Sequence, residues 1–208
     1  MTPSGGARAR LAVLLSGGGR TMLNLVDRAA RGGLDAEVAL VIASRECPGA
    51  ERALARGIPT LRMAGEIPRE TLGRVLRDHG AEWIVLAGYL RLLQVPPGFE
   101  RRAVNIHPAL LPSFGGPGMY GERVHRAVLE AGCKVSGCTV HLCDEAYDRG
   151  PIVAQRCCEV REDDSPESLG ARVFALESEL YPWALQRLLR GQWSIEGGRV
   201  RMIESRSG

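Results

Sequence analysis

The 208-residue sequence lacks several features that would mark whole classes of protein. No apolar run is long enough to cross a membrane, and residues 1–10 have no apolar core of the signal-peptide kind. The basic residues are scattered, and the formal net charge of +3 gives no argument for nucleic-acid binding. No long linker, internal repeat or low-complexity tract divides the chain. We therefore expect a single domain over residues 1–208, with residues 1–9 as a disordered tail and with neither a nucleic-acid nor a membrane partner.

The six cysteines form no Cys-x-x-Cys pair. Cys133, Cys138 and Cys143 follow one another at intervals of five residues, which on a strand places successive side chains on opposite faces. Such side chains cannot converge on one metal ion. We therefore predict free, partly buried thiols, no metal site, and a reducing, cytoplasmic compartment.

What the sequence does contain is an alternation of apolar runs and amphipathic segments. Buried strands are expected at 11–15, 37–43, 83–87 and 103–107, and helices at 21–30, 48–56 and 68–79. Strands that alternate with helices through short turns are typical of βαβ units, which build a parallel sheet with helices on both faces. The first half of the chain therefore predicts an α/β fold with a mostly parallel sheet.

The pattern changes after residue 107. Residues 108–120 are rich in proline and glycine and are expected to form a loop before a helix at 121–131. Strands at 134–143 and 151–160 flank a turn and are expected to pair antiparallel. Ser165-Pro166 is a helix start signal for a long helix, which Pro182 should kink or interrupt. Residues 193–202, with a turn at Gly197-Gly198, should form a hairpin.

A glycine-rich turn, residues 16–21 (Ser-Gly-Gly-Gly-Arg-Thr), joins the first strand to the first helix. Unpaired N–H groups at a helix N-terminus attract an anion, above all a phosphate, to which Arg20 adds a charge and Thr21 a hydroxyl. The spacing is not that of a dinucleotide site, because Met22 occupies the third glycine position, and no Gly-Lys-Ser/Thr sequence follows. Two interpretations stay open here, a phosphate site that includes Gly19 and a tight structural turn.

Asn105 and His107 are two residues apart on a short strand, so their side chains share a face. They lie at the expected carboxyl end of a parallel strand, where ligands bind in open α/β sheets. An amide can donate to a developing oxyanion, and a histidine can move a proton near neutral pH. Asp148 is the candidate carboxylate that orients the ring. Taken singly, each residue also has a structural interpretation, as a turn cap, a core histidine and a β-turn aspartate respectively.

Together these segments resemble a known family. Residues 105–112 (Asn-Ile-His-Pro-Ala-Leu-Leu-Pro) are similar to the signature of the folate-dependent formyltransferases, and residues 141–151 (His-Leu-Cys-Asp-Glu-Ala-Tyr-Asp-Arg-Gly-Pro) to their second signature. Residues 86–93 resemble the folate-pocket segment, and Glu177-x-x-x-Tyr-Pro182 the late helix. The resemblance extends from about residue 11 to residue 203. It implies a Rossmann-like formyltransferase fold with an antiparallel C-terminal part.

The resemblance also implies a reaction. A formyl group passes from the co-substrate 10-formyltetrahydrofolate to an amine, while Asn105 and a protonated His107 stabilise the oxyanion and Asp148 raises the pKa of His107. The similarity is greatest to the branch that formylates glycinamide ribonucleotide in de novo purine biosynthesis, as a monomer or homodimer. The implied phosphate and ribose contacts are Gly19, Arg20, Thr21 and Glu177. The implied folate contacts are Arg69, Leu90, Arg91, Leu92, Leu93, Asn105 and Asp144.

The sequence departs from the family pattern at the expected nucleotide end. Arg20-Thr21 stands where many members have Ser-Asn, Phe174 where a polar residue is usual, and Ser178 where His or Lys is common. These departures leave a second acceptor open, another amine such as an amino sugar nucleotide. Two further hypotheses are a non-catalytic folate- or nucleotide-binding module, disfavoured because all three catalytic positions are filled, and an NAD(P)-binding protein, disfavoured by the missing third glycine.

Overall fold

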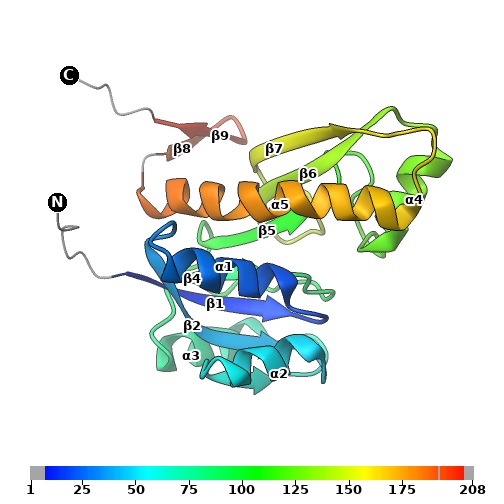
Figure 1. Cartoon of the computed structure of the whole chain (residues 1–208). Helices are drawn as coiled ribbons and strands as arrows, with labels where there is room; N and C mark the ends of the chain where they lie inside the picture. Colours follow the sequence, from blue (N-terminus) through cyan, green and yellow to red (C-terminus); the bar gives the residue numbers. More distant parts are fainter. Residues whose placement is uncertain (1–7, 192, 204–208) are drawn as a thin grey trace.

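The computed structural model describes residues 8–191 and 193–203. A seven-stranded sheet with strand order β3-β2-β1-β4-β5-β6-β7 forms the centre of the molecule, and a two-stranded hairpin, β8-β9, lies beside it (Figure 1). The strands are β1 (Ala9–Leu15), β2 (Ala36–Ala43), β3 (Thr60–Arg62), β4 (Trp83–Leu86), β5 (Ala103–His107), β6 (Val135–Leu142), β7 (Ile152–Glu159), β8 (Trp193–Glu196) and β9 (Arg199–Met202). The helices are α1 (Arg20–Ala30), α2 (Pro48–Ala55), α3 (Arg69–Asp78), α4 (Glu122–Glu130) and α5 (Pro166–Leu189).

The first five strands pair in parallel, whereas β6 pairs antiparallel with β5 and β7 antiparallel with β6. This confirms the predicted mostly parallel α/β sheet and its antiparallel C-terminal part. The strand order reverses between β1 and β4, because β2 and β3 lie on one side of β1 while β4 and β5 lie on the other. Ligands of open α/β sheets bind at such a point, outside the carboxyl ends of the strands.

The sheet has a hydrophobic core on each face. On one face α1, α4 and α5 pack against alternate strand residues such as Leu11, Val13 and Val85, all fully buried. On the other face α3 and residues 93–99 cover the intervening residues, among them Leu14. Successive strand residues point to opposite faces, and both faces are covered. The inner strands are therefore continuous apolar runs in the sequence.

Three details differ from the sequence-based predictions. Strand β3 was not predicted, because it is a three-residue edge strand recognisable only by its pairing with β2. Helix α5 continues through Pro182, so the expected interruption is wrong; the neighbours Leu180, Tyr181 and Ala184 are buried and hold the helix in place. The expected tail extends too far, because Ala9 already pairs with β2, while residues 1–7 lie outside the described part.

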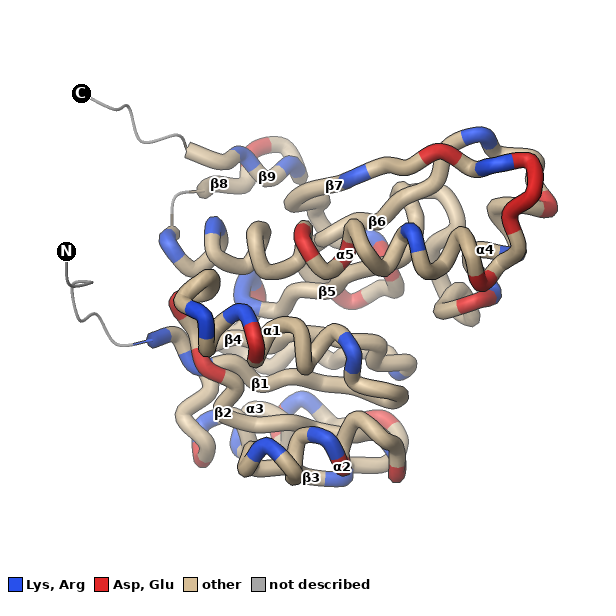
Figure 2. The backbone as a smooth tube through the Cα atoms, in the orientation of Figure 1, with Lys and Arg blue, Asp and Glu red and all other residues tan. Residues whose placement is uncertain are grey.

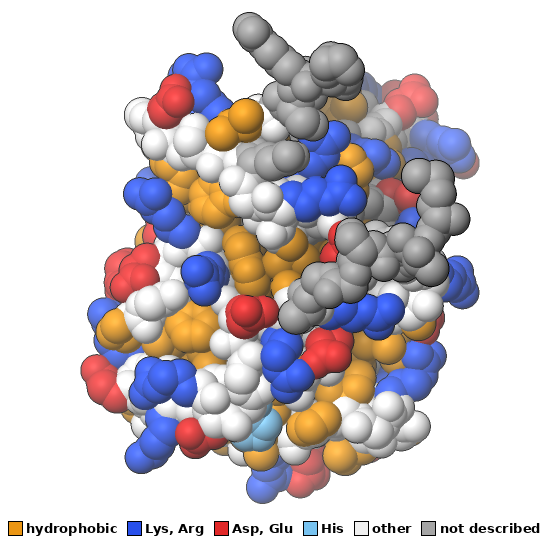
Figure 3. All heavy atoms as spheres, turned by 90° about the vertical axis from the view of Figure 1, so that its left-hand side faces the viewer, with side chains coloured by type: hydrophobic (Ala, Val, Ile, Leu, Met, Phe, Trp, Pro, Cys, Tyr) orange, Lys and Arg blue, Asp and Glu red, His pale blue; other side chains and the backbone are white. Residues whose placement is uncertain are grey.

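Charged residues of both signs are distributed along the chain in both halves of the sheet (Figure 2). On the face turned to the left in Figure 1, basic and acidic side chains intermingle around hydrophobic ones (Figure 3). Within the described residues, no helix is long and apolar enough to cross a membrane.

Candidate active site

A cavity of about 380 Å³ opens at the reversal of strand order. The chain after β1 continues to one face of the sheet, and the chain after β4 continues to the other face. The cavity lies where these two segments diverge. Seven parts of the chain line the cavity: residues 17–21, residues 86–93, the end of β5 at 105–108, the loop at 116–121, His125 of α4, residues 141–148, and one face of α5 at 170–177. All the site residues predicted from the sequence line it except Arg69.

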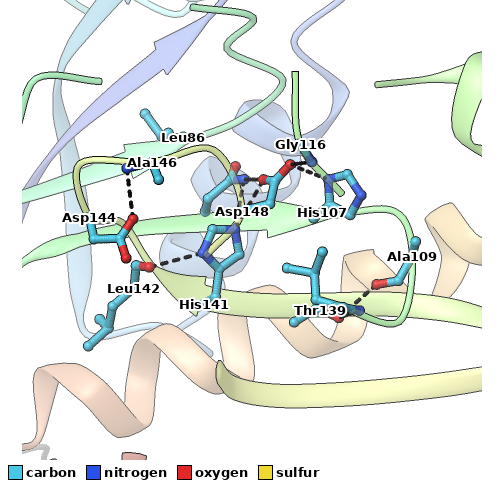
Figure 4. Close-up of polar contacts among 12 residues, drawn as sticks. Leu86, His107, Ala109, Gly116, Thr139, His141, Leu142, Asp144, Ala146 and Asp148 are labelled. Carbon is cyan, nitrogen blue, oxygen red and sulfur yellow. Dashed lines mark hydrogen bonds and ion pairs between the residues drawn. The ribbon is translucent and has the colours of Figure 1, made fainter. Parts of the chain in front are cut away.

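Asp148 lies at the centre of a polar cluster on the wall of this cavity (Figure 4). Its carboxylate is 3.5 Å from His107 Nδ1 on one side and 3.5 Å from His141 Nε2 on the other. The Gly116 amide donates to Asp148 Oδ2 at 2.9 Å. Burial by itself would raise the pKa of Asp148, but the two histidines and this amide outweigh burial, so that its pKa is lowered. Asp148 is therefore a carboxylate at neutral pH.

His107 is 3% exposed, and both of its ring nitrogens have partners. Nε2 donates to the Phe114 carbonyl at 2.8 Å, and Nδ1 faces the Asp148 carboxylate. Burial lowers the pKa of His107 more than Asp148 and the Phe114 carbonyl raise it. The expected upward contribution of Asp148 to the pKa of His107 is thus present, but burial outweighs it and the net shift is downward. The loop that carries Phe114 causes this burial, and its position could not be read from the sequence.

Asn105 and His141 complete the cluster from adjacent strands. They are direct partners in the antiparallel register of β5 and β6. The Nδ1 group of His141 donates to the Leu142 carbonyl at 2.9 Å, which leaves Nε2 free to accept from Asn105 Nδ2 at 3.1 Å. Asn105 Nδ2 also donates to Asp148 Oδ1 at a longer 3.4 Å. These bonds fix which end of the Asn105 amide carries its hydrogens.

The loop after β5 is anchored by a buried hydroxyl. Thr139 donates to the Ala109 carbonyl at 2.7 Å and accepts from the amides of Leu111 and Gln155 at 3.0 and 2.9 Å. The Leu111–Pro112 peptide bond is cis. Phe114 and Asp148 both have positive φ, an uncommon conformation for residues other than glycine, and both contact His107. The backbone around the cluster is therefore held in place by the surrounding contacts.

The glycine-rich turn combines both interpretations left open by the sequence. Gly19 has φ 74°, and a Cβ atom on it would lie 2.7 Å from the Cα of Gly49 at the start of α2, so close packing requires glycine there. Gly19 is also the N-cap of α1, where no side chain caps the first turn. The amides of Arg20 and Thr21 thus lack helical acceptors and border the cavity. Glycine is therefore required for the packing of this turn, and the turn also presents a helix N-terminus that attracts anions.

Glu177 projects into the same end of the cavity from α5. It is 9% exposed, and no hydrogen bond or ion pair from the described residues reaches its carboxylate. Burial raises its pKa to about 7, against the opposing charge of Arg20. An unpaired buried carboxyl group is costly, which indicates a polar ligand partner.

Residues 86–93, the segment expected to bind folate, form another part of the cavity wall. Ser16 Oγ accepts from the Leu90 amide at 3.0 Å, which ties this segment to the glycine-rich turn. Leu93 is buried in the core beneath the cavity wall. Asp144 Oδ1 accepts from the Ala146 amide at 3.0 Å and so shapes its own turn. Arg69 instead pairs with Glu145 at 3.2 Å, on the outside of that turn.

Several lining residues were not assigned from the sequence. His141 is one of them, and its strand register directly opposite Asn105 places it in the site. His125 of α4 lines the cavity with an unpartnered Nδ1, and burial, followed by the charge of His107, lowers its pKa. Tyr89 and Tyr147 also line the cavity, and no local sequence pattern reveals them.

The six cysteines are all free, as predicted. Burial raises the pKa of Cys138 to about 12, which keeps it protonated and inert. Within residues 8–191 and 193–203, no group of three or more His, Cys, Asp or Glu side chains is arranged to hold a metal ion.

Comparison with known proteins agrees with this geometry. A model of the formyl transferase family matches residues 9–185. The chloroplastic phosphoribosylglycinamide formyltransferase of Arabidopsis thaliana is 42% identical over 84% of this chain, which spans 63% of that relative. The corresponding protein of Vigna unguiculata is 39% identical over 96% of this chain and 67% of its own length.

A solved structure agrees over a larger share of both chains. The glycinamide ribonucleotide transformylase 1 of Symbiobacterium toebii is 37% identical, with a TM-score of 0.87 and 96% of each chain covered. The fold, the cavity at the strand reversal and the matched sequence thus point the same way. The chain belongs to the formyl transferase family.

Proposed function

We propose that this chain transfers the formyl group of 10-formyltetrahydrofolate to the amine of glycinamide ribonucleotide, a step of de novo purine biosynthesis. The observation that carries the proposal is the convergence of Asn105, His107 and Asp148 on the wall of a cavity that is also lined by a helix N-terminus with no side-chain cap. Formyl transfer needs an oxyanion donor and a proton carrier, and a ribonucleotide needs an anion site. The names of the relatives from plants and from Symbiobacterium toebii support the same acceptor.

The three residues have complementary tasks in this reaction. When the amine attacks the formyl carbon, Asn105 Nδ2 donates to the developing oxyanion, exchanging its 3.4 Å contact with Asp148. His107 takes the proton that the attacking amine loses, and the Asp148 carboxylate beside Nδ1 stabilises the resulting charge. As the bond from the formyl carbon to the folate nitrogen breaks, His107 returns this proton to the leaving nitrogen. Asp148 itself stays ionised. A neutral histidine beside a fixed carboxylate suits a proton carrier that must both accept and release its proton.

The two ends of the cavity divide the substrates between them. Gly19, Arg20 and Thr21 would hold the phosphate, and Glu177 the ribose hydroxyl groups, which supply the partner that its carboxyl group lacks. Leu90, Arg91, Leu92 and Leu93 would line the pterin end, with the 144–148 turn at its polar edge. Arg69 would meet the folate tail only after release from Glu145.

The test is a steady-state assay that follows absorbance as the formyl-folate donor is consumed, with a panel of amine acceptors. Consumption that requires glycinamide ribonucleotide supports the proposal. Consumption that instead requires an amino sugar nucleotide would keep formyl transfer and replace the acceptor, in line with the departures at Thr21 and Phe174. Donor binding without consumption for any amine would favour a binding module and contradict the proposal.

The setting of this activity is part of the proposal. We propose a cytoplasmic enzyme that acts as a monomer or homodimer on small-molecule substrates, with no metal, nucleic-acid or membrane partner. Free cysteines on the described chain support a reducing compartment, and the even mixture of charges supports small-molecule partners. The plant relatives carry chloroplastic names.

A further inference from the structure

The nucleotide end of the cavity contains a cation that makes no hydrogen bond within the described residues. The guanidinium of Arg20, the first residue of α1, lies 4.1 Å from the centre of the Phe174 ring of α5. Both residues line the cavity. Two neighbouring arginines differ, because Arg45 donates to the Ser16 carbonyl and Arg52 to the Gly18 carbonyl. Of these three, only Arg20 makes no hydrogen bond within the described residues, so all of its donors stay available to a ligand.

Stacking is a way to hold a guanidinium without using its donors. The face of the group lies over the ring, while the N–H bonds point outward in the plane of the group. An ion pair or a hydrogen bond to the protein would use those same N–H groups. An arginine fixed by stacking therefore stays ready for the planar, two-point contact that arginine makes with phosphate.

The surroundings of the pair indicate an anionic ligand that also carries hydroxyl groups. Gly170, Phe174 and Glu177 follow one another along the face of α5 that borders the cavity. Glu177 is buried and has no partner of its own among the described residues, while the first amides of α1 lie opposite. A phosphate beside Arg20 and a hydroxyl group beside Glu177 would satisfy both ends.

We propose that Phe174 is a positioning residue that holds Arg20 over the N-terminus of α1 and thereby makes the site selective for a phosphorylated acceptor. The inference rests on the proposed formyl transfer to a ribonucleotide and names the residue pair that recognises its phosphate. Phe174 acts through Arg20 and makes no contact of its own with the phosphate. Arg20 supplies the charge for the phosphate contact, and the Phe174 ring 4.1 Å away holds the guanidinium in place.

Calorimetric binding of ribose 5-phosphate tests the pair without requiring turnover. Phe174→Leu should weaken binding about 3- to 10-fold, the effect of losing one partly desolvated cation–π contact. Phe174→Tyr keeps a ring and should restore affinity to within about twofold. Arg20→Ala should weaken binding at least about 10-fold, because charge-assisted bonds to phosphate are lost.

A double variant distinguishes positioning from general packing. If Phe174 acts through Arg20, adding Phe174→Leu to Arg20→Ala should cause no further loss of affinity. Trp183→Leu is a matched control, because it removes another ring–arginine pair of α5, with Arg187 at 5.1 Å, outside the cavity. That variant should bind ribose 5-phosphate as the parent protein does.

Three outcomes would overturn the inference: no binding of ribose 5-phosphate by the parent protein, unchanged affinity in a folded Phe174→Leu protein, or an equal loss on the Arg20→Ala background. In the formyl-transfer assay, Phe174→Leu should raise the KM of the phosphorylated acceptor and leave kcat and the KM of the donor unchanged. Failure of the proposed function looks different, because the parent protein would then bind ribose 5-phosphate with the predicted coupling but consume no donor with glycinamide ribonucleotide.

Discussion

At the scale of single residues, the account depends on a buried carboxylate that touches two histidines and an amide. Asp148 contacts His107 and Asn105 of β5 and His141 of β6. Such a cluster is sensitive to the loss of one member, because the remaining polar groups stay buried without their partner.

We predict that His107→Ala and Asp148→Asn each lower turnover by at least ~100-fold, the usual effect of losing a proton carrier or the group that stabilises its charge. Initial rates of donor consumption with glycinamide ribonucleotide measure this. Circular dichroism of each variant checks that the fold is retained. Rates near those of the parent protein in either variant would show that the site is assigned wrongly.

Asp148→Asn should also change the titration of His107. Burial lowers the pKa of His107, and the Asp148 charge is the largest influence that opposes burial. With the carboxylate replaced by an isosteric amide, we expect the pKa of His107 to fall further below its ordinary value. NMR titration of the His107 ring measures the shift. A higher pKa in Asp148→Asn would contradict the described electrostatics.

The buried carboxyl group of Glu177 should make the free energy of unfolding depend on pH. Its folded pKa of about 7 lies above the ordinary value, so the folded state keeps a proton that the unfolded state has already lost. Stability should therefore fall as pH rises from about 4.5 to about 7, on the order of 1–3 kcal/mol, and level off above that range. Urea unfolding of the parent protein and Glu177→Gln across this range measures it. Parallel curves for the two proteins would refute the assignment.

At the scale of elements, short turns fix the site more than the helices and strands do. The glycine-rich turn is held by backbone contact with the start of α2, since Gly49 donates to the Gly17 carbonyl at 3.0 Å. The loop after β5 is held by Thr139, and the 86–93 segment by Ser16. These anchors join neighbouring strand ends into one wall.

Gly19→Ala should destabilise the protein by more than about 1 kcal/mol, because it combines positive φ with a backbone clash against Gly49. Gly17→Ala is the matched control for stability, since a Cβ atom there meets nothing within 4 Å. Thermal unfolding of both variants measures the difference. Equal stability of the two would show that the turn packs differently.

Thr139→Val should cost about 1–3 kcal/mol, because it leaves the Leu111 amide and the Ala109 carbonyl buried without their shared hydroxyl partner. Thr139→Ser keeps the hydroxyl and should recover most of that loss. Urea unfolding of the pair measures the cost. If the serine variant is as unstable as the valine variant, stability does not follow the hydroxyl group, and the role assigned to its hydrogen bonds is wrong.

At the scale of the whole molecule, the fold could largely be predicted, because apolar runs bounded by glycine mark strands buried on both faces. Asn105 and His107 could be placed at a strand end on the same argument. The edge strand β3 could not be predicted, since its three residues depend on pairing with β2 for their conformation. The lowered pKa of His107 could not be predicted either, because it follows from burial beside the loop that carries Phe114. The contact of Arg20 with Phe174 joins residues far apart in the sequence.

The central claim is that formyl transfer occurs directly at the wall formed by Asn105, His107 and Asp148. The measurement is carbon NMR with donor labelled by ¹³C in its formyl group, glycinamide ribonucleotide as acceptor, and Asp148→Asn as the matched variant. The account predicts that the label appears in the formamide of the ribonucleotide with the parent protein and at least ~100-fold more slowly with the variant. Label released as free formate, or equal transfer by both proteins, would contradict it.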